Sequence, residues 1–314
     1  MKIFIIILNW NQAKLTMECV DSVRKMKVPS NYNLNIVVVD NGSEHPVTLS
    51  EVERSLSGNT RDSSTSVGMT KVIQNNKNLG FAGGNNVGIK YALDNFADYV
   101  MILNNDTLVD PSLLANLLNG MQKDPKAAIV SPKIYFAKGF EFKKEKYKKA
   151  DLGKVIWYAG GKMDWKNIYG SNIGVDEVDK GQYDKEKEID FATGACFLIS
   201  ATVLKETGIF DEKYFMYLED ADLSLRMKKK KYKIIYEPKA ELWHKVAQSS
   251  GIGSNLNDYF ISRNRLLFGF KYASLRTKLA LIRESFRLFI FGRHWQAVGI
   301  RDFYMRRFGK GSWV

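Results

Sequence analysis

The sequence predicts an α/β protein with a mostly parallel central sheet flanked by helices, and two observations predict it. Short β-branched apolar runs alternate with segments of helical periodicity, and each run ends at a polar turn. Such alternation is typical of parallel sheets covered by helices on both faces. With 314 residues, of which 45% are hydrophobic and 26% charged, the chain is long enough for one large domain with appendages.

The first half of the chain carries the clearest pattern. The predicted strands are residues 3–8, 34–39, 71–74 and 99–103, and the predicted helices are residues 15–26, 86–95 and 112–121. The apolar start is too short for a signal peptide, so we expect a first strand there. Polar clusters at residues 9–11, 40–43 and 104–106 each follow a strand directly. Ligands of parallel sheets bind beyond the carboxyl ends of the strands, so we expect these clusters to line one crevice.

The second half has weaker signals. The composition of residues 55–66 predicts a flexible surface loop. The Lys-rich residues 136–149 are expected to form an exposed insertion. An antiparallel extension is expected from strands at residues 155–161 and 187–200. A helix over residues 219–230 and a short strand at residues 233–236 follow. Beyond residue 254 the chain becomes basic and aromatic with helical spacing.

Charge and cysteine content limit the function classes. The formal net charge of +13 indicates an anionic partner, which could be nucleic acid, anionic lipid or a phosphorylated substrate. The only two cysteines, Cys19 and Cys196, lie far apart in no metal-ligand spacing, which argues against a disulfide scaffold and favours a cytoplasmic location. No apolar run approaches the roughly 18 to 20 residues that a membrane span requires.

Six motifs occur in a fixed order: VVVDNGS (37–43), NLGFAGGNN (78–86), LNNDT (103–107), TGACFLI (193–199), FDEKYFMYLEDADLSLR (210–226) and WH (243–244). In this order they closely resemble glycosyltransferase family 2, and within it the rhamnosyltransferase-like members that build bacterial surface polysaccharides. The resemblance runs from about residue 3 to about residue 265. It implies a GT-A fold with a Rossmann-like sheet, a nucleotide-diphosphate sugar donor, a divalent cation (Mn or Mg) and inversion of the anomeric centre.

The domain organisation follows from the resemblance and the change in composition. We expect a GT-A domain over residues 1–253, with a nucleotide-binding half at 1–125 and an acceptor-binding half at 126–253. Residues 254–314 form a basic, amphipathic helical region.

The nucleoside is expected near the ends of the first two strands. Asp40 ends a buried strand, where a carboxylate can accept hydrogen bonds from a base or ribose. The resemblance implies that Asp40, Asn9 and Asn11 contact the nucleoside. The alternative for Asp40 is a capping role in its Asp-Asn-Gly-Ser turn.

A glycine-rich segment is the next candidate for donor binding. Gly80, Gly83 and Gly84, with Asn78, could let backbone amides approach a phosphate or sugar before a helix that begins near Asn86. They lack the spacing of a dinucleotide-binding motif, and ordinary turn glycines remain the alternative.

A metal site is expected at Asp106. Asn104, Asn105 and Asp106 stand in place of the family's Asp-x-Asp motif, with one carboxylate instead of two. Asp106 can supply the hard oxygen ligand that a cation bridging two phosphates needs, and Asn104 then binds ribose or a metal-bound water. The resemblance implies that His244 completes the site. The alternatives are a helix cap for Asp106 and a structural role for His244.

The catalytic base is expected at the start of the 219–230 helix. Inverting transfer needs a carboxylate on the face opposite the leaving diphosphate, to take the proton of the acceptor hydroxyl. Asp220 is the candidate, and Glu219 is expected to contact the acceptor or the donor sugar. Acids in a first helical turn can instead be partners of the helix dipole, which suits Asp222 better. We expect Asp40, Asp106, Asp220 and His244 to open onto one cavity.

The tail contains a basic amphipathic segment whose apolar positions recur at helical spacing: Leu275, Leu279, Ile282, Phe286 and Phe289. Such a helix can lie on an anionic membrane surface, or it can dock on the catalytic domain with its basic face solvated. Arg263 and Arg265 are candidates for contacting the phosphates of an acceptor.

Together these features predict an inverting, metal-dependent hexosyltransferase. Its donor would be a dTDP- or UDP-linked sugar and its acceptor a glycan or lipid-linked hydroxyl, at the inner face of the cell membrane. A nucleic-acid-binding protein and a catalytically inactive sugar-nucleotide-binding relative are the other classes considered. No nucleic-acid-binding module is recognisable, and Asp106, Asp220 and His244 favour an active enzyme.

Overall fold

The computed structural model describes residues 1–54, 67–246 and 253–313. The loop expected at residues 55–66 lies outside them. Within the described residues the larger sheet has ten strands. Eight of them form one path, in spatial order β10 (Lys187–Glu188), β12 (Lys233–His244), β6 (Ala127–Phe136), β11 (Cys196–Ser200), β4 (Tyr99–Asn104), β1 (Lys2–Asn9), β2 (Asn33–Asp40) and β3 (Val67–Gln74).

Four adjacent strands, β4, β1, β2 and β3, run parallel, as predicted. Their carboxyl ends meet at one edge, because Asn9 pairs with Asp40 and its neighbour Leu8 pairs with Asn104. The three polar clusters that follow these strands therefore lie side by side.

The other half of the sheet is mixed. The segment at residues 187–200 is not one strand of an extension: β10 pairs with β12, whereas β11 inserts into the main sheet, antiparallel to both β4 and β6. The turn at Gly194 and Ala195 precedes β11. β12 is longer than the four residues predicted, because a bulge between Glu237 and Glu241 accommodates Pro238 and pairing then resumes.

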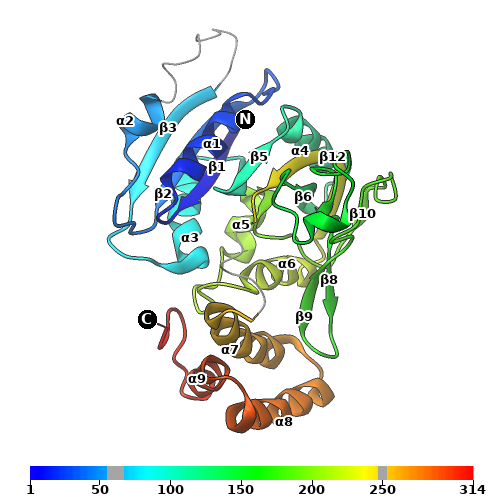
Figure 1. Ribbon diagram of the computed structural model, residues 1–314. Coiled ribbons are helices and arrows are strands. Elements are labelled where there is room, and N and C mark those ends of the chain that lie inside the picture. The colour runs from blue at the N-terminus through cyan, green and yellow to red at the C-terminus, as the bar shows by residue number, and fades with distance from the viewer. Residues whose placement is uncertain (55–66, 247–252, 314) are drawn as a thin grey trace.

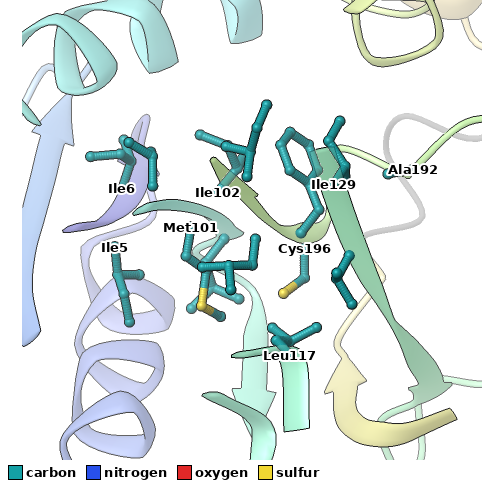
Figure 2. Close-up of a cluster of buried hydrophobic side chains, with 14 of the residues drawn as sticks. Ile5, Ile6, Met101, Ile102, Leu117, Ile129, Ala192 and Cys196 are labelled. Atoms are coloured by element: carbon teal, nitrogen blue, oxygen red, sulfur yellow. The ribbon is translucent and has the colours of Figure 1, made fainter. Parts of the chain in front are cut away.

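Helices cover both faces of the sheet: α1 (Ala13–Arg24), α2 (Leu49–Arg54), α3 (Gly80–Asp94), α4 (Leu113–Lys123), α5 (Ala201–Thr207) and α6 (Glu219–Lys229). Figure 2 shows the core, in which successive residues Ile5 and Ile6 of β1 point to opposite faces, as the pleat of a strand requires. Ile6 contacts α3, where Gly88 leaves no room for a side chain. Leu117 of α4 packs on the other face with Met101.

The predicted antiparallel extension is present in a smaller form. β7 (Ile156–Tyr158) pairs with β6, β5 (Thr107–Val109) pairs with β12, and β8 (Gly161–Asp164) forms a separate two-stranded sheet with β9 (Tyr169–Asn172). The Lys-rich insertion begins later than expected, since Phe136 is a buried end of β6. Within residues 143–150 all side chains except that of Tyr147 are exposed, and these residues include the short helix η1 (Lys144–Lys146).

Three helices end the chain: α7 (Asn255–Tyr272), α8 (Leu275–Phe291) and α9 (His294–Tyr304). They form a layer of their own beside α6 and the β8–β9 hairpin (Figure 1). α7 is largely buried and α8 packs on it through Leu281, which contacts Gly269. None of the described helices combines the length and the apolar character needed to cross a membrane.

Candidate active site

A cavity of about 400 Å³ lies between the sheet edge and α7. Predicted site residues from four elements line it: Asn104 from β4, His244 from β12, Glu219 and Asp220 from α6, and Arg265 from α7. Segments that are distant in the sequence therefore meet here, as the sequence predicted for Asp220 and His244.

Asp220 sits in the first turn of α6, with its carboxylate held by two backbone amides. The N–H of Gly194 donates to Oδ2 at 2.9 Å and that of Ala221 to Oδ1 at 2.7 Å. Burial raises the pKa of Asp220 above that of an ordinary aspartate, and the two amides act in the opposite direction. The carboxylate is thus fixed in orientation and is a stronger base than a solvated one.

Glu219 is buried beside it. Among the described residues, no hydrogen-bond partner reaches its Oε2 atom. Burial raises the pKa of Glu219 well above its usual range, and the adjacent Asp220 adds to the effect. An unpartnered carboxyl at a cavity wall is suited to binding a polar ligand, since an unmet hydrogen bond of a buried group is costly.

Asp222 faces away from the cavity into a buried network. It accepts hydrogen bonds from the hydroxyls of Tyr214 and Tyr272 and from the side chains of Lys271 and Arg226. Burial alone would raise the pKa of Asp222, but these hydrogen bonds and the positive charges hold it below its ordinary value. Asp222 therefore ties α6 to α7.

Asp106 and His244 are direct neighbours, with Nε2 of His244 2.9 Å from Oδ1 of Asp106. Two adjacent ligands of one octahedral cation, each about 2.1 Å from it, would lie about 3 Å apart, so the pair fits a shared divalent cation. The other ring nitrogen of His244, Nδ1, has no hydrogen-bond partner within the described part of the chain.

The protein supplies few metal ligands. Across the described residues, no three His, Cys, Asp or Glu side chains come together in a metal-binding group. A cation here would need further ligands from a bound diphosphate and water, as is usual for Mg²⁺. Asn105 is not among the residues that line the cavity, and its Nδ2 atom donates to Oγ1 of Thr16 in α1 at 3.0 Å.

Asp106 is not among the residues that line the cavity and meets it only through His244. Asp40 does not open onto the cavity either, so the prediction that Asp40, Asp106, Asp220 and His244 all open onto it is wrong. Asp40 is only 1% exposed and accepts hydrogen bonds from Asn9 and from the backbone amides of Ser43 and Val47. These contacts correspond to the capping role in the Asp-Asn-Gly-Ser turn, which was the alternative for Asp40. Asn9 is fully buried with it, and Asn11 accepts the amide of Glu44 at the exposed end of the loop. In this structure these side chains shape the loop at the sheet edge.

The glycine segment belongs to α3 itself, which begins at Gly80 and not near Asn86 as predicted. Gly80 has a left-handed φ of 74°, and a Cβ there would lie 2.5 Å from Phe215. A Cβ on Gly84 would lie 2.5 Å from Leu8, and one on Gly83 2.9 Å from Leu79. Asn78 accepts the amide of Gly80 at 2.8 Å. Close packing is the reason for glycine at these positions.

The two arginines differ from each other. Arg263 is fully buried and donates to backbone carbonyls, so the phosphate contact predicted for it is wrong. Arg265 lines the cavity, stacks on Tyr169 with its guanidinium 3.8 Å from the ring centroid, and pairs with Glu284. Its positive charge is therefore already partly neutralised.

Sequence reasoning missed several lining residues. Trp157 and Tyr169 give the cavity aromatic walls, and Trp157 meets the ring of His244 edge-on at 4.6 Å. Gly194, part of the TGACFLI motif, presents its amide to Asp220, and a Cβ there would lie 2.8 Å from Phe81. The TGACFLI motif is the sequence signal that could have identified Gly194 as a site residue. Trp157 and Tyr169 lie in the short strands β7 and β9, where no comparable motif marks them.

A family model described as Glycosyl transferase family 2 matches residues 4–208 of the chain. A relative from Mycobacterium tuberculosis (strain CDC 1551 / Oshkosh), N-acetylglucosaminyl-diphospho-decaprenol L-rhamnosyltransferase, is 26% identical over 154 residues, which cover 49% of each chain. The chain thus spans about half the length of the curated relatives it matches.

Two solved structures share the fold. The mannosyltransferase PcManGT of Pyrobaculum calidifontis, in complex with GDP-Man and Mn²⁺, aligns with a TM-score of 0.55 at 16% identity, covering 97% of this chain and 74% of that one. GalNAc-T7 with UDP, GalNAc and Mn²⁺ aligns with a TM-score of 0.59 at 17% identity, covering 92% of this chain and 56% of the other. The fold is therefore the GT-A fold.

Proposed function

This chain belongs to glycosyltransferase family 2, and from that membership we propose that it is an inverting, metal-dependent hexosyltransferase. The donor is a dTDP- or UDP-linked sugar, and the acceptor is a hydroxyl group of a glycan or of a lipid-linked saccharide. The observation that carries the proposal is that Asp220 and His244 line the same cavity, with Asp106 bound to His244.

Asp220 is the general base. Two amides fix its carboxylate at the cavity wall, and the raised pKa of Asp220 makes it a better proton acceptor than an exposed aspartate. It takes the proton of the acceptor hydroxyl as the oxygen attacks the anomeric carbon from the face opposite the leaving diphosphate. Glu219, with its unpartnered oxygen, hydrogen-bonds a sugar hydroxyl.

Asp106 and His244 would hold a divalent cation, Mn or Mg, together with the donor diphosphate. When bound, the cation neutralises charge on the leaving group. Asn104, at the end of β4 and also at the cavity, binds the ribose or a water of the cation. The complex of PcManGT with GDP-Man and Mn²⁺ and the structure of GalNAc-T7 with UDP, GalNAc and Mn²⁺ support a cation in this fold.

The aromatic walls and α7 form the acceptor side. Trp157 and Tyr169 offer apolar faces on which sugar rings can stack, and Arg265 lies behind Tyr169. The Mycobacterium tuberculosis relative is named for rhamnosyl transfer onto a diphospho-decaprenol-linked sugar, which supports a lipid-linked acceptor.

A lipid-linked acceptor favours a membrane-bound enzyme, and α8 has a suitable face. Its predicted apolar stripe is exposed: Leu279, Phe286 and Phe289 are 59%, 60% and 50% accessible. Exposed Arg283 and Arg287 lie beside the stripe. We infer that this face of α8, with its other side docked on α7 and α9, lies on an anionic lipid surface at the cytoplasmic side of the membrane. The unpaired, buried thiols of both cysteines favour that compartment.

A nucleotide-sugar panel tests the enzyme hypothesis. UDP- and dTDP-linked hexoses, including dTDP-rhamnose, are incubated with the protein and Mn²⁺, Mg²⁺ or chelator, and released nucleoside diphosphate is measured. We expect cation-dependent binding and slow sugar release from one of them. Cation-dependent binding without release or transfer would favour the inactive relative, whereas no binding of any donor would contradict both.

A further inference from the structure

The turn before Asp220 has a strained backbone. Phe215, Tyr217 and Leu218 have φ values of 64°, 68° and 71°, in the left-handed region that residues other than glycine adopt only at a free-energy cost. Leu218 is also the N-cap of α6, so Asp220 follows this turn by two residues. Such a conformation persists only where surrounding contacts determine it.

Asn264 of α7 supplies most of these contacts. Its Nδ2 atom donates to the carbonyl oxygens of Tyr214, Met216 and Tyr217 at 2.9, 2.7 and 3.0 Å. The side chain is fully buried. One amide group therefore holds the carbonyls on both sides of the left-handed Phe215.

Arg263 completes the support. Its Nη2 atom donates to the carbonyls of Lys213 and Tyr214 at 3.2 and 2.8 Å, and its Nη1 atom donates to Gly309 at 2.7 Å. Its Nε donates to Oδ1 of Asn264 at 3.0 Å, which orients the amide. The guanidinium thus links the turn to the C-terminal segment.

The opposite side of the turn contacts the start of α3. The carbonyl oxygen of Phe215 accepts a hydrogen bond from the backbone amide of Ala82 at 3.1 Å, and the ring of Phe215 lies against Gly80. The turn therefore connects the two helices that begin at the sheet edge, α3 and α6, while α7 lies directly beneath α6 (Figure 1).

We propose that Arg263 and Asn264 are positioning residues, which hold the strained turn and thereby fix Asp220 at the cavity wall. The proposal rests on the proposed function, in which Asp220 is the base. It also makes α7 part of the catalytic unit instead of a separate appendage.

The kinetic test compares variants of the full-length protein. Asn264→Leu keeps the size of the side chain but removes the donors, and Arg263→Lys, a milder change, keeps one donor group. We expect Asn264→Leu to lower kcat about 10- to 100-fold, because small displacements of a reacting group have effects of this order. KM for the donor should change little, and Arg263→Lys should retain more turnover than Arg263→Met.

Asp302→Asn is the matched control. Asp302 is fully buried in the same helical region, where it accepts hydrogen bonds from Tyr259 and Ser312, and it makes no hydrogen bond to residues 213–217 that would hold the turn. It should lower the melting temperature without a comparable loss of kcat. If Asp302→Asn and Asn264→Leu lose turnover equally at equal stability, Asn264 is only structural and the proposal is overturned.

Amide hydrogen exchange gives a readout that does not depend on activity. Peptides covering residues 213–222 should exchange at least several-fold faster in Asn264→Leu and Arg263→Lys than in the wild type or in Asp302→Asn. Unchanged exchange would overturn the proposal. If the wild type releases no sugar from any donor, the proposed function fails, and the exchange data still decide whether these residues hold the turn.

Discussion

Replacement of Asp220 by Asn tests the assignment of the base most directly. The change removes the negative charge and keeps the shape of the side chain. Both carboxylate oxygens now accept a backbone N–H, from Gly194 and from Ala221. An asparagine has one oxygen, so one of the two amides must face the new NH₂ group and lose its acceptor.

These contacts set the expected magnitudes. One unmet buried amide costs about 1–3 kcal/mol of folding stability. Loss of a general base lowers turnover about 10²- to 10⁴-fold, equivalent to about 3–5 kcal/mol in the barrier. Affinity for the nucleotide should be nearly unchanged, because the base acts only in the chemical step.

The assay measures sugar transfer or donor hydrolysis at saturating cation, with calorimetry of nucleotide binding and a thermal melt of each variant. Asp222→Asn is the control, since Asp222 lies in the same helical turn but faces away from the cavity. The Asp222→Asn variant should be less stable than the wild type, but its turnover should fall far less than that of Asp220→Asn. Wild-type turnover in folded Asp220→Asn with normal nucleotide affinity would refute the assignment.

Four further outcomes are expected. Asp106→Ala or His244→Ala should raise the cation concentration needed for nucleotide binding, and identical calorimetric affinity with and without chelator would contradict a shared site. Because the pKa of Asp220 is raised and its ionised form is the base, kcat should rise with pH through that pKa, above the ordinary value of about 4, and a flat profile over pH 4–7 would contradict this. The pKa of Asp222 is lowered by folding, so its contribution to stability is complete above the unfolded pKa of about 3.9 and disappears as pH falls through the folded pKa; the loss of unfolding free energy in Asp222→Asn, about 3 kcal/mol near pH 7, should therefore shrink below pH 4, as thermal melts would measure. Phe286→Ser should weaken sedimentation with phosphatidylglycerol vesicles, whereas Phe96→Ser, which changes a still more exposed phenylalanine outside the tail, should not; equal effects would argue against the α8 face.

Local patterns were sufficient for the parallel half of the sheet. β1, β2 and β4 are continuous β-branched runs with polar ends, and their ends meet where the pattern predicted. The register of β11 was not predictable in this way. Its run Cys196–Ser200 reads equally well as a strand of an extension, and only its pairing with both β4 and β6 puts it in the main sheet.

The site was predictable where the motif itself supplies the chemistry. Asp106, Asp220 and His244 each belong to one of the ordered motifs, and the structure brings Asp106 and His244 within 2.9 Å of each other. Asp40 illustrates the limit. Its position after a strand fits both a nucleoside contact and a turn cap, and the choice depends on the amides of Ser43 and Val47, which the sequence does not place.

The sequence by itself thus determined the parallel strands whose carboxyl ends meet at one edge, the helix that carries Asp220 and the apolar stripe of α8, because these depend on periodicity and on residue type over a few neighbours. Only the tertiary structure decided what Arg263 does. A buried guanidinium and one that binds phosphate have the same local sequence. The difference arises from the carbonyls of Lys213, Tyr214 and Gly309, some 50 residues away in either direction, which fold around it and satisfy its donors.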